Sequence, residues 1–210
     1  MSQHLIKMVD EIQRFVRLSP KVINAMQSVD RAFFVPEIFL DKAYSLDALP
    51  IEQSQWISSP LTVAIMTQSL MPQGGENVLE IGCGSGYQAM ILSKLFRRVC
   101  TIERIERLFL EARKRFSVLS ADNIFSKLGD GQDGWEEHAP YDAVIFSACA
   151  QGIPLKIIEQ LKEGGVLLMP FLQDGKQHIT RFVKIDGALS KPLVITQCLF
   201  VDVCNGILRQ

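Results

Sequence analysis

Residues Asn77–Tyr87 read NVLEIGCGSGY, and this stretch decides the fold. The apolar run that ends in glycine is typical of a buried strand, and the glycines allow a tight turn and a ligand close to the main chain. A dinucleotide-binding loop has the spacing GxGxxG, whereas here Tyr87 stands where the third glycine would be. Glu80 adds a carboxylate that a pyrophosphate could not use. The stretch therefore favours a ligand that carries positive charge, and a nicotinamide-dependent oxidoreductase is only a distant alternative.

Strands and helices alternate along the chain after this loop. In order, we expect a helix at Gln88–Phe96, a strand at Val99–Glu103, a helix at Glu106–Leu119, strands at Ile124–Leu128 and Tyr141–Ser147, a helix at Pro154–Leu161, a strand at Gly164–Pro170 and two final strands within 178–201. This pattern predicts an α/β fold, a doubly wound Rossmann-like α/β/α sandwich with a mostly parallel seven-stranded sheet. Ligands of such sheets bind at the carboxyl ends of the strands.

The residues before the loop are predicted to form an N-terminal helical extension. Apolar residues up to about Ala43 recur at helical spacing, and the stretch Leu46–Ser59 looks irregular. Ser59 is suited to cap a helix that begins at Pro60. We expect a single domain, with residues 1–72 as the helical and substrate-loop extension and 73–210 as the Rossmann-like core.

Composition excludes several classes of protein. The 210 residues are 48% hydrophobic and carry a formal net charge of −1, so no nucleic-acid partner is indicated. The N-terminus has no signal-peptide pattern and the longest apolar run is too short to span a bilayer, so we expect no membrane association. The five cysteines contain no CxxC pair, and the three histidines are widely separated. No metal site is therefore expected, and reduced thiols indicate a cytoplasmic protein.

Two more acidic residues stand at the ends of predicted strands. Glu103 could accept hydrogen bonds from both hydroxyls of a ribose, although it could equally pair with Arg104 or Arg107 in solvent. Asp130 could accept a bond from an adenine amino group, or simply shape an ordinary Asp-Gly turn. Glu80, Glu103 and Asp130 follow one another in the order that an adenosyl site requires. Together they predict S-adenosyl-L-methionine as the cofactor.

The chain resembles the protein-L-isoaspartate O-methyltransferase family over nearly its whole length. The segments that carry the resemblance are Val29–Pro36, Ala48–Ile51, Gln55–Pro60, Val78–Gln88, Ile102–Arg104, Gly129–Trp135 and Ala139–Asp142. The resemblance implies an enzyme that transfers a methyl group from S-adenosylmethionine to the free carboxylate of L-isoaspartyl residues in damaged proteins. The ester then closes to a succinimide, whose hydrolysis restores some normal aspartate. Isoaspartyl-containing proteins and peptides are the implied partners.

The resemblance also indicates the residues of the site. Ser58 matches the active-site serine, which we expect to orient the substrate carboxylate by its hydroxyl group rather than act as a nucleophile. Its alternative role is that of a second helix-capping serine beside Ser59. Cofactor contacts are expected at Gln55, Trp56, Ile57, Ser58, Gly82, Glu103, Arg104, Asp130 and Gly131, with Glu80, Gly84 and Gly86 added from the glycine loop itself.

Several positions depart from the family pattern near the expected substrate site. The loop before the serine usually reads Gly-x-Gly-Gln-Thr-Ile-Ser, whereas Glu52–Ser58 reads EQSQWIS, and the late Phe-Val-Pro is replaced by Phe200–Asp202. These changes leave open a methyltransferase of the same fold with a different acceptor, or a non-catalytic protein that binds S-adenosylmethionine. A monomer is expected in each case.

Overall fold

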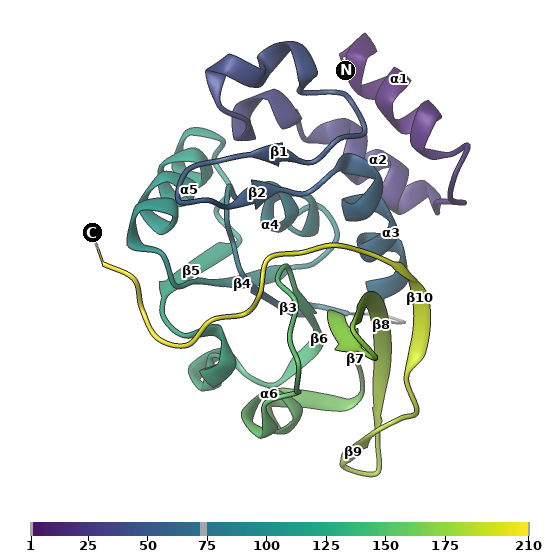
Figure 1. The fold of residues 1–210 in the computed structure, drawn as a ribbon, viewed down its shortest axis with the longest axis vertical. Coiled ribbons are helices and arrows are strands. Elements are labelled where there is room, and N and C mark those ends of the chain that lie inside the picture. Colours follow the sequence, from purple (N-terminus) through teal and green to yellow (C-terminus); the bar gives the residue numbers. More distant parts are fainter. Residues whose placement is uncertain (1, 72–74, 210) are drawn as a thin grey trace.

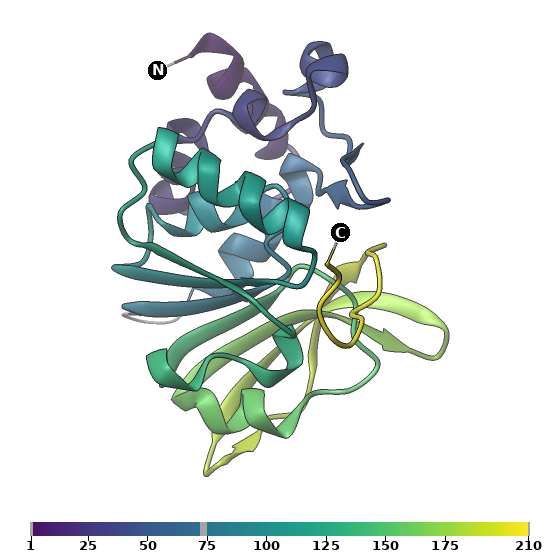
Figure 2. The ribbon, with the colours of Figure 1, turned by 90° about the vertical axis from the view of Figure 1, so that its left-hand side faces the viewer.

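The computed structural model describes residues 2–71 and 75–209 of the chain (Figure 1). The expected boundary between extension and core, at residues 72 and 73, lies outside the described residues. The core is a mainly parallel sheet between helices, and the N-terminal helices pack on one side of it (Figure 2). Its strands are β3 (Asn77–Ile81), β4 (Arg98–Glu103), β5 (Ile124–Leu128), β6 (Tyr141–Phe146), β7 (Leu161–Gln173), β8 (Lys176–Ile185) and β10 (Leu193–Gln197).

The strand order confirms the doubly wound sheet expected from the sequence. The order is β10-β8-β7-β6-β3-β4-β5, and the short β9 (Ala188–Leu189) pairs with β8 outside this path. The pairs from β7 to β5 are parallel, whereas β8 and β10 run antiparallel. The central strand β3 therefore has parallel neighbours on both sides, and its carboxyl end lies at the middle of the functional edge of the sheet.

Alternate residues of the central strands pack into two different cores. Val78 packs on the face covered by α3 (Pro60–Leu70), α4 (Tyr87–Leu92) and α5 (Glu106–Val118). Leu79 and Ile81 pack on the opposite face, where α6 (Leu155–Gln160) lies. Because both faces are covered, these strands are apolar runs without polar alternation, which is why the sequence made them easy to recognise.

A third core joins the N-terminal extension to the sheet domain. The helices α1 (Gln3–Ile12) and α2 (Pro20–Ser28) and the 3-10 turns η1 (Arg31–Phe34) and η2 (Glu37–Lys42) precede a hairpin of two very short strands, β1 (Leu49–Pro50) and β2 (Trp56–Ile57). Their apolar residues pack with Tyr87, Met90 and Ile91 of α4. The extension thus packs on a helix that begins at the glycine loop.

Element boundaries differ from the sequence prediction in a few places. The stretch 46–59 contains the β1–β2 hairpin, and α4 ends at Leu92 because the chain turns there before β4. The last strand ends at Gln197, beyond which the chain crosses the edge of the sheet as an irregular segment. The turns η3 (Gly131–Asp133) and η4 (Glu136–His138) follow β5. Within 2–71 and 75–209, no helix is both long and apolar enough to cross a membrane.

Candidate active site

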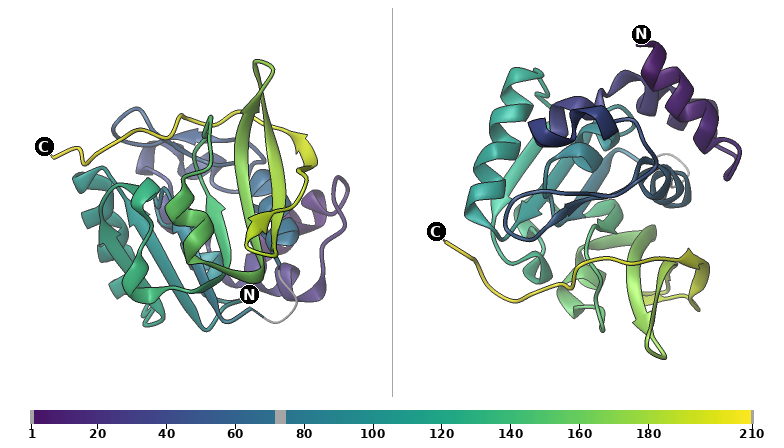
Figure 3. Two further views of the ribbon diagram at one scale, coloured as in Figure 1. Left: turned by 90° about the horizontal axis from the view of Figure 1, so that it is seen from below. Right: turned by 45° about the horizontal axis from the view of Figure 1, so that its top comes forward.

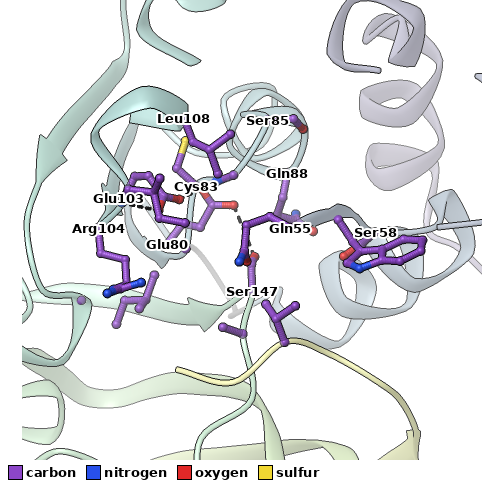
Figure 4. A pocket seen from close by; sticks show the side chains of 18 of the residues that line it. Gln55, Ser58, Glu80, Cys83, Ser85, Gln88, Glu103, Arg104, Leu108 and Ser147 are labelled. Carbon is purple, nitrogen blue, oxygen red and sulfur yellow. Dashed lines mark hydrogen bonds between the residues drawn. The ribbon is translucent and has the colours of Figure 1, made fainter. Parts of the chain in front are cut away.

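One cavity lies at the carboxyl edge of the sheet, where the sequence prediction placed the chemistry (Figure 4). Segments from distant parts of the chain line it: the β2 hairpin with Ser58, the glycine loop after β3, the end of β4, Ser147 and Ala148 after β6, and the C-terminal segment Val201–Cys204. Figure 4 shows Ser58 on the opposite side of the cavity from Glu103 and Arg104, with Glu80, Gln55 and Ser147 between them.

The glycine loop uses its backbone donors inside the fold. Gly82 and Cys83 donate their N–H groups to the carbonyl oxygen of Ile102 at 2.9 and 3.2 Å, and Gly84 donates to Oε2 of Glu103 at 2.8 Å. A phosphate-binding loop instead points its N–H groups at the ligand. The loop is therefore built to hold a carboxylate beside the cavity, which agrees with a ligand of positive charge.

Glu103 is fixed at the end of β4 by the backbone. Its Oε1 accepts from the N–H of Ile105 at 2.9 Å and its Oε2 from Gly84. Burial raises the pKa of this carboxyl above its usual range, although backbone hydrogen bonds and Arg104 oppose the shift. Each oxygen keeps a second lone pair, so Glu103 fits a pair of neighbouring hydroxyl groups such as those of a ribose.

Glu80 is the second carboxylate of the cavity and is completely buried. Thr101 Oγ1 donates to its Oε2 at 2.5 Å, and Ser147 Oγ lies 3.5 Å from its Oε1. Burial raises the pKa of Glu80 to about 8, and the nearby Glu103 adds to the shift. A buried carboxyl with no cationic partner among the described residues fits a ligand that brings its own positive charge, as S-adenosylmethionine does.

Three expected cofactor residues occupy different places in the loop region. Gly131 lines the cavity, and a Cβ atom on it would lie 2.3 Å from Ile81 Cγ2. Gly86 lies outside the cavity lining; it begins α4 with φ of 89° and leaves room for the ring of Phe116. Asp130 also lies outside the lining and accepts N–H bonds from Gln132 at 2.9 Å and from Gly206 at 2.7 Å.

Ser58 and Ser59 have different surroundings despite being neighbours. Ser59 caps α3, because its Oγ accepts from the N–H of Thr62 at 3.0 Å. Ser58 lines the cavity, and its hydroxyl group makes no hydrogen bond with any residue in the described part of the chain. Ser59 is thus the cap that the sequence predicted, and Ser58 makes no second capping bond within the described chain, so its hydroxyl is available to a ligand.

Arg31 holds the backbone of Ser58, and sequence reasoning did not single it out. The side chain is 0% exposed and donates to the carbonyl oxygens of Ala43 at 2.9 Å, Asp47 at 3.0 Å and Ser58 at 3.1 Å. Burial lowers its pKa to about 10, and its guanidinium carbon lies 5.9 Å from the centre of the Tyr87 ring. The only sequence signal was its place in the family segment Val29–Pro36.

Other lining residues were also absent from the sequence prediction. Ser147 directly follows β6, so the rule that ligands bind at carboxyl strand ends could have found it. Gln88 donates to Thr67 Oγ1 at 3.0 Å from the first turn of α4. Tyr87 also lines the cavity, and its buried hydroxyl has no hydrogen-bond partner among the described residues.

The β1–β2 hairpin covers one side of the cavity and is connected to α5 by an ion pair. Arg107 forms an ion pair with Glu52 at the hairpin turn, with Nη2 2.8 Å from Oε1. Gln53 and Ser54 have φ of 61° and 55°, so the turn keeps a left-handed backbone without glycine. The replaced glycines therefore did not remove the hairpin. Trp56 lines the cavity but is 55% exposed at its rim.

The C-terminal segment covers the other side of the same edge. It runs from β10 across the sheet towards β5, below the hairpin in Figure 1 and on the same side of the molecule in the views of Figure 3. Arg104 donates from Nε to the carbonyl oxygen of Gly206 at 3.0 Å, and Leu208 donates to the carbonyl oxygen of Arg104 at 2.8 Å. Arg104 therefore anchors this segment and lines the cavity at once. Among the residues described, no group of three His, Cys, Asp or Glu could hold a metal ion.

A family model matches nearly the whole chain. Residues 2–207 match the family model described as protein-L-isoaspartate(D-aspartate) O-methyltransferase (PCMT). A protein-L-isoaspartate O-methyltransferase of Helicobacter pylori strain J99 is 52% identical over 200 residues, which are 95% of this chain and 96% of that protein. One of Parvibaculum lavamentivorans is 39% identical over 212 residues, covering 99% and 95%.

Solved structures agree on the fold. A structure titled protein-L-isoaspartate O-methyltransferase superimposes with a TM-score of 0.87 at 23% identity, covering 96% of this chain and 66% of that one. A putative enzyme of the same name from Plasmodium falciparum, in complex with S-adenosyl-L-homocysteine, gives a TM-score of 0.82 at 22% identity and covers 97% and 99%.

Proposed function

The chain belongs to the protein-L-isoaspartate(D-aspartate) O-methyltransferase family, and we propose that the cavity between Ser58 and the glycine loop is its active site. The protein is an S-adenosylmethionine-dependent enzyme that methylates the free carboxylate of L-isoaspartyl residues in proteins. The proposal rests on one observation. In a single cavity, the hydroxyl group of Ser58, which has no hydrogen-bond partner in the described chain, lies opposite the buried carboxyl groups of Glu80 and Glu103.

The two carboxylates are proposed to hold the cofactor. Glu103 accepts the ribose hydroxyls, and Glu80 faces the positively charged end of the molecule. The loop residues Gly82, Gly84 and Gly131 let it approach the backbone. When bound, S-adenosylmethionine supplies an electrophilic methyl group on a sulfonium. Gln55, Trp56 and Ile57 of the hairpin cover the sulfonium and keep water away from it. Exclusion of water strengthens every charge interaction within the cavity. Gly86 and Asp130 then act without touching the cofactor. Gly86 acts through the packing of α4, and Asp130 through the position of the C-terminal segment.

Ser58 is proposed to orient the acceptor. A carboxylate is already ionised near neutral pH, so the reaction needs no general base and depends on alignment. The Ser58 hydroxyl donates to one carboxylate oxygen and leaves the other free to meet the methyl group. Arg31 positions this serine through its carbonyl oxygen, and is not itself in contact with the acceptor.

The decisive experiment compares an isoaspartyl peptide with its aspartyl twin. Both peptides are incubated with the enzyme and S-adenosylmethionine that carries a labelled methyl group, and the base-labile methyl ester is counted. We expect label on the isoaspartyl peptide alone. Equal labelling of both peptides, or none of either, would show that the acceptor is a different one.

We propose that the enzyme acts as a single-domain monomer in the cytoplasm, without a nucleic-acid partner. The extension shares one apolar core with α4 of the sheet domain, which supports a single folded unit over the described residues 2–71 and 75–209. The five cysteines are all unpaired, which suits a reducing compartment. Lys and Arg number 22 against 23 Asp and Glu, so the chain lacks the basic excess of a nucleic-acid-binding protein.

A further inference from the structure

Asp202 lies where the active-site cavity meets a second cavity. The second cavity is lined by Gln132, Cys149, Ala150, Gln151, Gly152, Ile153, Pro154, Asp202 and Val203, and shares Asp202 and Val203 with the first. The backbone there is fixed, because Cys149 donates to the carbonyl oxygen of Val201 at 2.8 Å and Val203 donates to that of Cys149 at 2.7 Å. The position of Asp202 therefore does not depend on a loose chain end.

The carboxylate of Asp202 has no counter-charge in the structure. In the described ranges it makes no side-chain hydrogen bond and no ion pair, and no Lys or Arg lines the second cavity. Arg104 lines the first cavity, but its Nε and Nη2 donate to the carbonyl oxygens of Gly206 and Asn205. Asp202 is exposed to solvent, and it carries a negative charge without an ionic partner in the described ranges at the rim that the two cavities share.

The rest of the second cavity suits an aliphatic chain. Ala150, Ile153, Pro154 and Val203 provide apolar walls, and Cys149 adds a buried thiol. A lysine side chain has the matching chemistry, since its methylene stem packs on apolar surface while its ammonium group remains at a polar rim. An arginine side chain likewise has an apolar stem and a charged end. An acidic side chain would meet the unpaired charge of Asp202 at close range.

We propose that Asp202 and the second cavity form a subsite for a lysine or arginine that flanks the isoaspartyl residue of the substrate. This inference rests on the proposed function, because it assumes that the isoaspartyl carboxylate reaches Ser58 through the first cavity. The part of the substrate chain next to the isoaspartyl residue then leaves the first cavity over the rim formed by Asp202 and Val203. Asp202 is a specificity-determining residue, which favours basic and disfavours acidic neighbours of the damaged site.

The test uses one isoaspartyl peptide with Lys, Gln or Glu placed in turn at each of three positions on either side of the isoaspartyl residue. The readout is kcat/KM for methyl transfer. At one position at least, we expect the Lys peptide to exceed the Glu peptide by about fivefold, the upper end for a partly exposed ion pair. The difference should lie mainly in KM and should shrink in about 0.5 M salt because of screening.

Variants assign the preference to Asp202. Asp202→Asn should reduce the Lys-to-Glu ratio to near one, and Asp202→Lys should invert it. Asp122→Asn is the matched control: it removes one exposed carboxylate just before β5, at the opposite edge of the sheet, and should keep the ratio of the wild type. A ratio that stays the same in Asp202→Asn, or no preference in the wild type, overturns the subsite. Failure to methylate even the Gln peptides would instead contradict the proposed function.

Discussion

At the scale of single residues, Ser58 and Ser59 are adjacent in sequence but make separate contributions. Ser59 completes a helix cap, whereas the hydroxyl of Ser58 faces the cavity without a partner in the described chain. We expect Ser58→Ala to lower kcat for isoaspartyl peptide by about a hundredfold, the lower end of the range for loss of one oriented hydrogen-bond donor. Affinity for S-adenosylmethionine, measured by calorimetry, should be nearly unchanged.

Ser59→Ala is the matched control for this experiment. It should lower the free energy of unfolding by about 1 kcal/mol through loss of the cap, and leave turnover close to that of the wild type. Thermal unfolding and the methylation assay separate the two effects. Full activity of Ser58→Ala would show that the serine does not orient the acceptor.

Glu80 makes cofactor binding depend on pH. Its pKa is raised to about 8 in the ligand-free protein by burial, and a bound positive charge favours its ionised form. Binding near pH 7 should therefore release a proton, and affinity should rise by about tenfold between pH 6.5 and 8.5 and then level off. Calorimetry in buffers of different ionisation enthalpy measures the proton directly. Glu80→Gln should bind with little pH dependence; proton release that persists in this variant would have to come from another group.

The same group affects stability in the opposite direction. The folded protein keeps a proton on Glu80 between the ordinary pKa of a glutamate and about 8, whereas the unfolded chain has lost it. The contribution of Glu80 to the free energy of unfolding is therefore fully present below the unfolded pKa and is lost as pH rises through about 8. S-adenosylmethionine should restore much of this loss.

At the scale of elements, Gly131 sets how closely the loop after β5 approaches the end of β3. A Cβ atom there would lie 2.3 Å from Ile81 Cγ2, a side chain packed in the central sheet. We expect Gly131→Ala to lower the free energy of unfolding by about 1–3 kcal/mol, the range for overpacking, and to weaken cofactor binding. Denaturant unfolding and calorimetry measure both.

Gly152 supplies the control for this substitution. A Cβ on Gly152 would meet no atom within 4 Å, so Gly152→Ala should change the free energy of unfolding by less than about 0.5 kcal/mol. If Gly131→Ala lowered the free energy of unfolding as little as Gly152→Ala, the backbone after β5 would have to shift easily. The close approach of this loop to the end of β3 could then not be important for the cavity.

The elements also show what a sequence can and cannot reveal. The strands β3 to β6 were predicted because each is a short and largely apolar run, and the carboxylates Glu80 and Glu103 followed from their places at or near strand ends. The two-residue strands β1 and β2 have no such period, so their hairpin was missed. The sequence also does not show which distant segments make contact. For this reason the hydrogen bond from the N–H of Gly206 to Asp130 could not be predicted.

At the scale of the whole molecule, Arg31 holds the segments of the N-terminal extension in place beside the start of α4. It lies in η1, its donors reach the segments that contain Ala43, Asp47 and Ser58, and its guanidinium stacks near Tyr87 at the start of α4. The extension also contacts the sheet domain through an apolar core, through the ion pair between Glu52 and Arg107, and through the hydrogen bond from Gln88 to Thr67. Arg31 is therefore a polar contact through which folding of the extension sets the backbone position of Ser58, the proposed active-site serine.

Replacing Arg31 should impair stability and catalysis together. Arg31→Lys keeps the charge but cannot reach three carbonyl oxygens with a planar fork, and Arg31→Met leaves all three without this donor. We expect Arg31→Met to cost about 3–5 kcal/mol of unfolding free energy. Arg31→Lys should cost less, and should still lower kcat because Ser58 is no longer held.

Arg97→Met is the control, since its ion pair with Glu76 is exposed and should contribute at most about 1 kcal/mol. Thermal unfolding, methylation of isoaspartyl peptide and calorimetry with S-adenosylmethionine should be measured on all three variants. The informative result is a folded Arg31→Lys protein that binds the cofactor with normal affinity but turns over slowly, because Glu80 and Glu103 lie on strands that Arg31 does not contact. Loss of cofactor affinity in equal proportion would show that Arg31 supports the whole cavity rather than the acceptor side.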